Sequence, residues 1–182
     1  MFVALEDFGS DVLAAVGLVA LASTWMESAA IAVAISAGSS VDKATASKDS
    51  GAWRRALLTR DGTLVSGLAD HGGRVTAWAV RAASLAESRN ASVHGELVPN
   101  PEALAHARGQ LGHAHPSPPP YLLIHHRSGT RATLGADAAD LVDLGRRIEA
   151  HARAGVLLSM ALDGELPWDL ADKLWASEAF SS

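Results

Sequence analysis

Apolar positions along the chain recur mainly at the three- and four-residue spacing that is typical of amphipathic helices. Residues 7–37 predict one long helix that is apolar over more than one face, ends at Gly38 and therefore belongs at the centre of a bundle. Residues 74–94 predict a second long helix with a single apolar stripe, followed by Gly95 at a C-cap position. The stripe comprises Val75, Trp78, Ala79, Ala82, Leu85, Ala86 and Val93.

The second half of the chain alternates between irregular and regular patterns. Residues 98–120 contain most of the seven prolines and predict a long irregular connection, with at most one helical turn from Glu102 to Arg108. Residues 121–134 predict a small β-hairpin, and residues 137–162 predict a third long helix that ends at Asp163-Gly164. The expected inner face of that helix comprises Leu141, Leu144, Ile148, Ala152, Val156 and Met160.

Two shorter helices complete the predicted architecture. One is expected over 63–70, before a break at Gly72-Gly73. The other lies within the C-terminal segment 165–182, from Trp168 to Phe180, and is expected to pack through Trp168, Leu174 and Trp175. Together the elements predict an all-α single domain over 1–182, an up-and-down helical bundle with a small β-hairpin inserted before the last long helix.

Composition supports a globular chain with a substantial core. Of the 182 residues, 48% are hydrophobic and 5% are aromatic, and the prevalence of alanine and leucine favours helix. The formal net charge of −5 argues against a general basic face for nucleic acid, although it leaves room for a small basic pocket. Because the chain has no cysteine, it has no disulfide, thiol nucleophile or cysteine-based zinc site.

The apolar run over 12–22 raises the question of a membrane segment. Acidic residues precede the run, whereas a signal peptide begins with a basic stretch. Polar residues, including Thr24 and Glu27, interrupt the chain before the roughly 20 apolar residues of a membrane helix are reached. We therefore expect a buried bundle helix in a cytoplasmic protein, with a membrane span or membrane-surface helix as the alternative.

The segment from Arg89 to Gly95 carries the residues best suited to chemistry. Asn90 and His94 are four residues apart and share one helix face, whereas Arg89 and His94 are about 140° apart on an ideal helix. A guanidinium beside an imidazole suits phosphoryl chemistry, because arginine binds phosphate oxygens in pairs and histidine exchanges protons with ribose oxygens. The alternative is a helix C-terminus whose cationic side chains pair with the last carbonyls.

The pattern Arg-Asn-x-x-x-His-Gly at the end of an amphipathic helix resembles the motif of HEPN-domain proteins. The resemblance implies a homodimeric helical bundle that cleaves RNA without a metal or cofactor, as in toxin–antitoxin or phage-defence systems, with an antitoxin as a further partner. It implies that His94 is the general acid/base, that Arg89 stabilises the developing charge, and that Asn90 orients His94 or touches the phosphate. One histidine cannot easily be base and acid at once, so a symmetric dimer would supply the second.

Two further positions bear on this resemblance. Trp25-Met26-Glu27 resembles a Trp-x-Glu pattern of related bundles, in which case Glu27 supports Arg89; the alternative is a structural carboxylate paired with Arg81 or Arg89. Glu96 stands where some toxins carry a tyrosine that the antitoxin modifies, so control by that modification is not expected. The acidic Glu96 and net charge favour the alternative function, a non-catalytic HEPN-like dimeric binding or scaffold module.

The remaining histidines do not predict a metal site. His113 and His115 lie in the irregular connection without a nearby carboxylate pair, and His125 and His126 are neighbours in a strand, so they point to opposite faces. A second Arg-x-x-x-x-His spacing ends at His113 but lacks the polar second residue and the underlying helix. No phosphate-binding loop or nucleophile elbow is present, which argues against nucleotide hydrolases and serine hydrolases.

Overall fold

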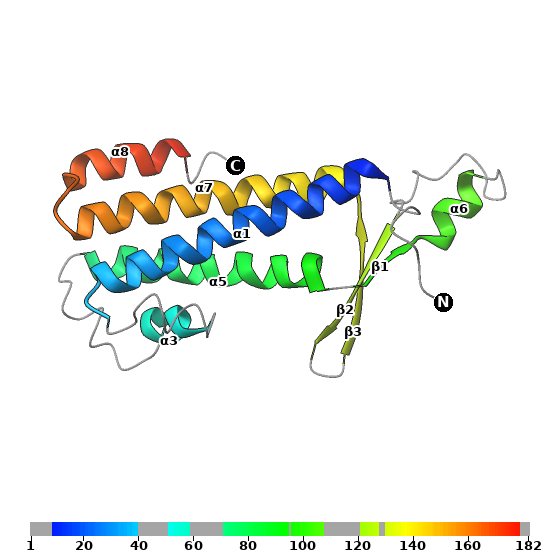
Figure 1. Ribbon diagram of the computed structural model, residues 1–182, viewed down its shortest axis with the longest axis horizontal. Coiled ribbons are helices and arrows are strands. Elements are labelled where there is room, and N and C mark those ends of the chain that lie inside the picture. The colour runs from blue at the N-terminus through cyan, green and yellow to red at the C-terminus, as the bar shows by residue number, and fades with distance from the viewer. Residues whose placement is uncertain are drawn as a thin grey trace. The chain divides into compact units, whose positions relative to one another are not determined.

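A computed structural model describes residues 9–39, 51–58, 71–94, 96–107, 121–127 and 130–178 (Figure 1). These residues are mostly helical, which confirms the all-α class. The predicted helix over 63–70 and residues 108–120 of the predicted connection lie outside the described residues.

The chain divides into two compact units, each built from two chain segments. Unit 1 comprises Met1–Ala20 and Glu87–Gly145, and unit 2 comprises Leu21–Ala86 and Arg146–Ser182. The single domain expected over 1–182 therefore stays a prediction.

Three long helices, α1 (Ser10–Ser36), α5 (Gly72–His94) and α7 (Ala138–Leu162), correspond to the three predicted from the apolar spacing. Gly72 and Gly73, however, lie inside α5 instead of breaking the chain. The first four amides of any helix lack an intrahelical partner, so two glycines in the first turn interrupt little. The shorter helices are α3 (Ala52–Leu58), α6 (Pro101–Ala107) and α8 (Trp168–Glu178).

Helices α1 and α7 end in the same left-handed turn. Gly38 has a φ of 88° and Gly164 a φ of 75°. The next residue donates its amide back across the turn in both cases, from Ser39 to Ala34 and from Glu165 to Met160, each over 2.9 Å. This is the Schellman arrangement, and it confirms the two helix ends predicted from the glycines.

A glycine with a positive φ after a helix and a glycine within a helix lead to opposite expectations for substitution by alanine. A Cβ at Gly164 meets no atom within 4 Å, so Gly164→Ala is expected to cost about 1–2 kcal/mol through its positive φ alone. A Cβ at Gly73 also meets no atom within 4 Å, but Gly73 lies in α5. Gly73→Ala is therefore the matched control and is expected to raise the free energy of unfolding by up to about 1 kcal/mol. Urea unfolding of both variants measures the difference, and equal effects of the same sign would contradict the backbone explanation.

Unit 1 contains a three-stranded antiparallel sheet in the order β1-β2-β3. The strands are β1 (Glu96–Pro99), β2 (Tyr121–Arg127) and β3 (Thr130–Ala136). The register pairs Leu97 of β1 with Leu123 of β2, and Leu123 with Leu134 of β3.

The prediction of an irregular connection over 98–120 is wrong at its beginning. Its first residues complete β1, whereas the helical turn expected from Glu102 to Arg108 is present as α6, which begins at Pro101. The Asn100 side chain accepts the amide of Glu102 at 3.0 Å, as an N-cap residue does. An Asn-Pro pair therefore begins this helix, because proline suits the first helical position and needs no hydrogen bond there.

The core of unit 2 is formed by the apolar faces of α1, α3, α5 and α7. The stripe predicted for α5 is confirmed over most of its length, since Val75, Trp78, Ala79, Ala82 and Leu85 are all buried. The prediction for α7 fails at Val156, which is 47% exposed, whereas Leu158 is buried. Gly155 occupies the closest approach instead: a Cβ there would lie 2.5 Å from Cζ2 of Trp78 and 3.1 Å from Cβ of Ala29.

The inner face of α8 also differs from its prediction. Ala171 is buried, whereas Leu174, which was expected to pack the helix, is 36% exposed. Trp168 does pack, since its ring stacks on that of His71 with 3.7 Å between centroids, and the guanidinium of Arg74 lies 5.2 Å from the same ring. Arg74 also pairs with Asp172 at 2.8 Å, so α8 is attached to the beginning of α5 within unit 2.

Helix α1 is buried along one face, although its sequence is apolar over more than one face. Its large apolar side chains Leu13, Leu21, Trp25 and Ile35 are between 41% and 52% exposed. Among the described helices, α1 is long and apolar enough to cross a membrane, but the core helix of a soluble protein or a signal sequence passes the same test.

Candidate functional site

The residues predicted to carry chemistry lie in the last two turns of α5, in unit 1. Arg89 and Asn90 are both half-buried, and Nη1 of Arg89 donates a hydrogen bond to Oδ1 of Asn90 at 2.9 Å. His94 is the last residue of α5, and β1 begins two residues later at Glu96. The structure therefore brings Arg89 and Asn90 together and places the backbone of His94 one helical turn beyond Asn90.

The contact between Arg89 and Asn90 gives Asn90 a role that the sequence did not suggest. The sequence predicted that Asn90 would orient His94 or touch phosphate. In the structure its carbonyl oxygen is engaged by the guanidinium of Arg89, which limits the directions in which the guanidinium can point. An asparagine side chain keeps an NH₂ group with two donors when its oxygen is used, so Asn90 can still serve a second acceptor.

Glu27, the predicted supporting residue, is half-buried on α1 and belongs to unit 2. Arg89 belongs to unit 1. The support of Arg89 by Glu27 therefore stays a prediction.

The other histidines singled out in the sequence fall on β2 or outside the described residues. His125 lies opposite Ala132 and His126 opposite Arg131 in the β2–β3 register. Residues 108–120, which include His113 and His115, are not described. In the described part of the chain, no group of three or more histidine, aspartate or glutamate residues could hold a metal ion.

A histidine that was not singled out in the sequence lies in the core of unit 2. His151 on α7 is 7% exposed and its ring is parallel to that of Trp78, with 5.1 Å between centroids and 6° between planes. Nε1 of Trp78 donates to the backbone carbonyl of His151 at 3.0 Å, and Nε2 of His151 lies 2.9 Å from the backbone carbonyl of Trp78. A carbonyl only accepts, so Nε2 carries the hydrogen.

Burial gives His151 an unusual protonation equilibrium. Desolvation lowers the pKa of His151 to about 4; the hydrogen bond to Trp78 raises this pKa and the positive charge of Arg81 lowers it. The neutral imidazole therefore stays in the core at neutral pH. His151 falls on the inner face of the helix predicted over 137–162, and this position was the sequence signal for its burial.

The lowered pKa of His151 predicts acid-sensitive folding. The unfolded chain takes up a proton near the ordinary histidine pKa of about 6.5, whereas the folded chain does so only near about 4, so stability is full above the first value and is lost as pH falls toward the second. We expect the free energy of unfolding to fall by about 2 kcal/mol between about pH 7.5 and about pH 5. Urea titrations at several pH values measure this change.

Two histidine variants separate this effect from other titrations. His151→Phe should unfold more easily than the wild type at neutral pH but lose most of the dependence on pH in this window. His106 is half-buried on α6, and His106→Ala should keep the dependence of stability on pH. An unchanged slope in His151→Phe would assign the acid sensitivity to other groups.

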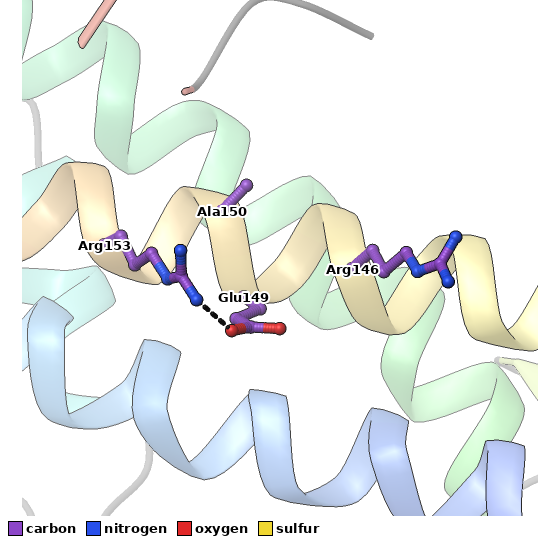
Figure 2. A pocket seen from close by; sticks show the side chains of 4 residues that line it. All are labelled: Arg146, Glu149, Ala150 and Arg153. Atoms are coloured by element: carbon purple, nitrogen blue, oxygen red, sulfur yellow. Dashed lines mark hydrogen bonds and ion pairs between the residues drawn. The ribbon is translucent and has the colours of Figure 1, made fainter. Parts of the chain in front are cut away.

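A pocket on α7 contains two arginines in unit 2. It has a volume of about 210 Å³ and is lined by Arg146, Glu149, Ala150 and Arg153. Figure 2 shows Glu149 and Arg153 turned toward one another and Arg146 apart from them at the other end of the pocket. Nη2 of Arg153 donates to Oε1 of Glu149 at 2.6 Å, and the two side chains are 62% and 26% exposed.

No protein-family model, curated protein or solved structure matches the chain. The resemblance to HEPN-domain proteins therefore rests on the residues around Arg89 and His94 and on the few others noted in the sequence.

Proposed function

We propose that the protein is a HEPN-like, metal-independent endoribonuclease that acts as a cytoplasmic homodimer. The observation that supports this most is the 2.9 Å contact between Arg89 and Asn90 on a helix that ends at His94. It provides a guanidinium held by its neighbour, five residues before the histidine that ends the helix. The proposal includes the up-and-down helical-bundle topology of that family.

The proposed reaction is an internal transesterification. The 2′-hydroxyl oxygen attacks the adjacent phosphorus, and the bond from phosphorus to the leaving 5′-oxygen breaks. His94 of one copy accepts the 2′-hydroxyl proton, and His94 of a second copy donates a proton to the 5′-oxygen. Arg89 stabilises the negative charge that develops on the phosphate oxygens, and Asn90 positions Arg89. The products are a 2′,3′-cyclic phosphate and a 5′-hydroxyl end.

The test is incubation of the purified full-length protein with end-labelled single-stranded RNA in the presence of EDTA. We expect cleavage with 2′,3′-cyclic phosphate ends, and we expect the active species to be a dimer in sedimentation. Cleavage that EDTA abolishes would contradict the metal-independent mechanism. Full activity in a monomeric species would contradict the use of two His94 side chains.

The second candidate function is a non-catalytic dimeric module that binds or scaffolds another protein, such as a neutralising partner. The net charge of −5 and the position of Glu96, two residues beyond His94 at the start of β1, favour this reading because both repel a polyanion. A folded dimer, free of any partner, that neither cleaves RNA nor binds it in a salt-dependent manner would support the module and overturn the nuclease.

A further inference from the structure

We propose that the α7 pocket lined by Arg146, Glu149, Ala150 and Arg153 binds two phosphates of a single-stranded RNA backbone. This inference rests on the proposed function, because that function identifies the bound polymer as RNA. It deepens that function by assigning a substrate-holding surface separate from the residues that carry the chemistry.

The positions of the two arginines on α7 favour an extended anion. Arg146 and Arg153 are seven residues apart, so they lie on the same face of the helix about two turns, or roughly 10 Å, apart along its axis. Figure 2 shows the two guanidinium groups at opposite ends of the pocket, with Glu149 between them. A single phosphate would engage one guanidinium, whereas successive phosphates along a strand can engage both.

The charge and access of the pocket also suit a polyanion. Both arginines are exposed, and within the described part of the chain no ion pair occupies Arg146. Ala150 leaves room between the longer side chains, and the pocket volume of about 210 Å³ is open to solvent. Two arginines and one glutamate give this pocket a formal charge of +1 on a chain whose net charge is −5. The small basic pocket left open by the overall acidity is therefore found here.

The carboxylate of Glu149 lies where a phosphate oxygen would bind Arg153. It accepts the hydrogen bond from Arg153 that a phosphate oxygen would accept. An ion pair with this exposure contributes little to stability, so exchange for a phosphate costs little. Glu149 thus competes with the ligand, and removing its charge should strengthen binding.

Fluorescence anisotropy with a labelled single-stranded oligoribonucleotide in EDTA tests the assignment. The His94→Ala background prevents turnover during the measurement. We expect Arg146→Ala/Arg153→Ala to weaken RNA binding by about tenfold or more. The slope of log affinity against log salt should become shallower by about 1.4, because two phosphate contacts are lost. Glu149→Gln should bind RNA more tightly than its parent.

The control removes the same charge elsewhere. Arg55→Ala/Arg81→Ala lacks two exposed arginines on α3 and α5 and should retain most of the affinity. An equal loss of affinity in both double variants would overturn the proposal, because RNA binding would then depend on the net charge and not on this pocket. Binding of inorganic phosphate that responds to the arginines, while RNA binding does not, would overturn the assignment to an RNA backbone.

A cleavage assay at saturating RNA separates this inference from the proposed function. Arg146→Ala/Arg153→Ala on the wild-type background should reach the same maximal cleavage rate, because neither arginine takes part in the chemistry. Cleavage by the wild type with no change in RNA affinity in this variant would overturn the pocket alone. Arginine-dependent RNA binding without cleavage by the wild type would overturn the nuclease alone.

Discussion

His94→Ala is expected to slow RNA cleavage by about 10²–10⁴-fold, with little effect on folding. The variant removes the group that the proposed mechanism uses twice, as base in one copy and as acid in the other, and positioned proton transfer contributes about this much to a rate. Single-turnover cleavage of a labelled RNA at saturating protein measures the chemical step. Helix α5 ends at this residue, so shortening its side chain leaves the preceding helical hydrogen bonds in place.

The matched control is His106→Ala, which removes a histidine from the last turn of α6 and should cleave at the wild-type rate. Arg89→Ala should slow cleavage, whereas Asn90→Ala should have a smaller effect, because it removes only the residue that positions Arg89. Equal rates for His94→Ala and His106→Ala would rule out His94 as the catalytic histidine. A larger loss in Asn90→Ala than in Arg89→Ala would contradict the positioning role.

Trp78→Ala is expected to lower the free energy of unfolding by about 3–5 kcal/mol. Trp78 is 1% exposed, so the variant leaves a large cavity between the apolar faces of unit 2. It also removes both the stacking on His151 and the hydrogen bond to the His151 carbonyl. Urea unfolding followed by far-ultraviolet circular dichroism measures the loss without relying on tryptophan fluorescence.

Trp25→Ala provides the control for the loss of a tryptophan as such. Trp25 is 49% exposed on α1, so its replacement should change the free energy of unfolding by no more than about 0.5 kcal/mol. A similar cost in both variants would mean that the exposed face of α1 is covered under the conditions of the measurement. Such a result would require a search for the covering molecule before the Trp78 value is interpreted.

Much of the fold follows from local patterns in the sequence. The ends of α1 and α7 were predictable because Gly38 and Gly164 supply the left-handed residue that these turns require. The inner face of α5 was predictable from its single apolar stripe. The helical turn expected from Glu102 to Arg108 is present as α6, and Asn100-Pro101 carries the local signal for its start.

Other features depend on contacts that a one-dimensional pattern does not contain. Val156 fits the helical period but is exposed, because Gly155 takes the position of closest approach to Trp78 and Ala29. The contact between Trp78 and His151 joins residues 73 positions apart in the sequence. Nothing in the spacing of either helix indicates that these two rings face one another.

The candidate site also has some features that the sequence predicts and others that it does not. The position of His94 at the end of a helix could be predicted, because Gly95 marks the stop. The hydrogen bond from Arg89 to Asn90 could not, because adjacent residues on a helix do not face one another and the contact depends on side-chain conformation. The α7 pocket was missed because arginines on an amphipathic helix are ordinary surface residues until their surroundings are known.

The close approach at Gly155 also constrains how this gene can vary. Every single-base change of a glycine codon that replaces the amino acid introduces a larger side chain, beginning with the methyl group of alanine. At Gly155 that first methyl already collides with Trp78, whose ring is enclosed by the core. Every missense change at position 155 therefore forces the Trp78 ring or its surroundings to shift, and a smaller residue opposite it would relieve the collision.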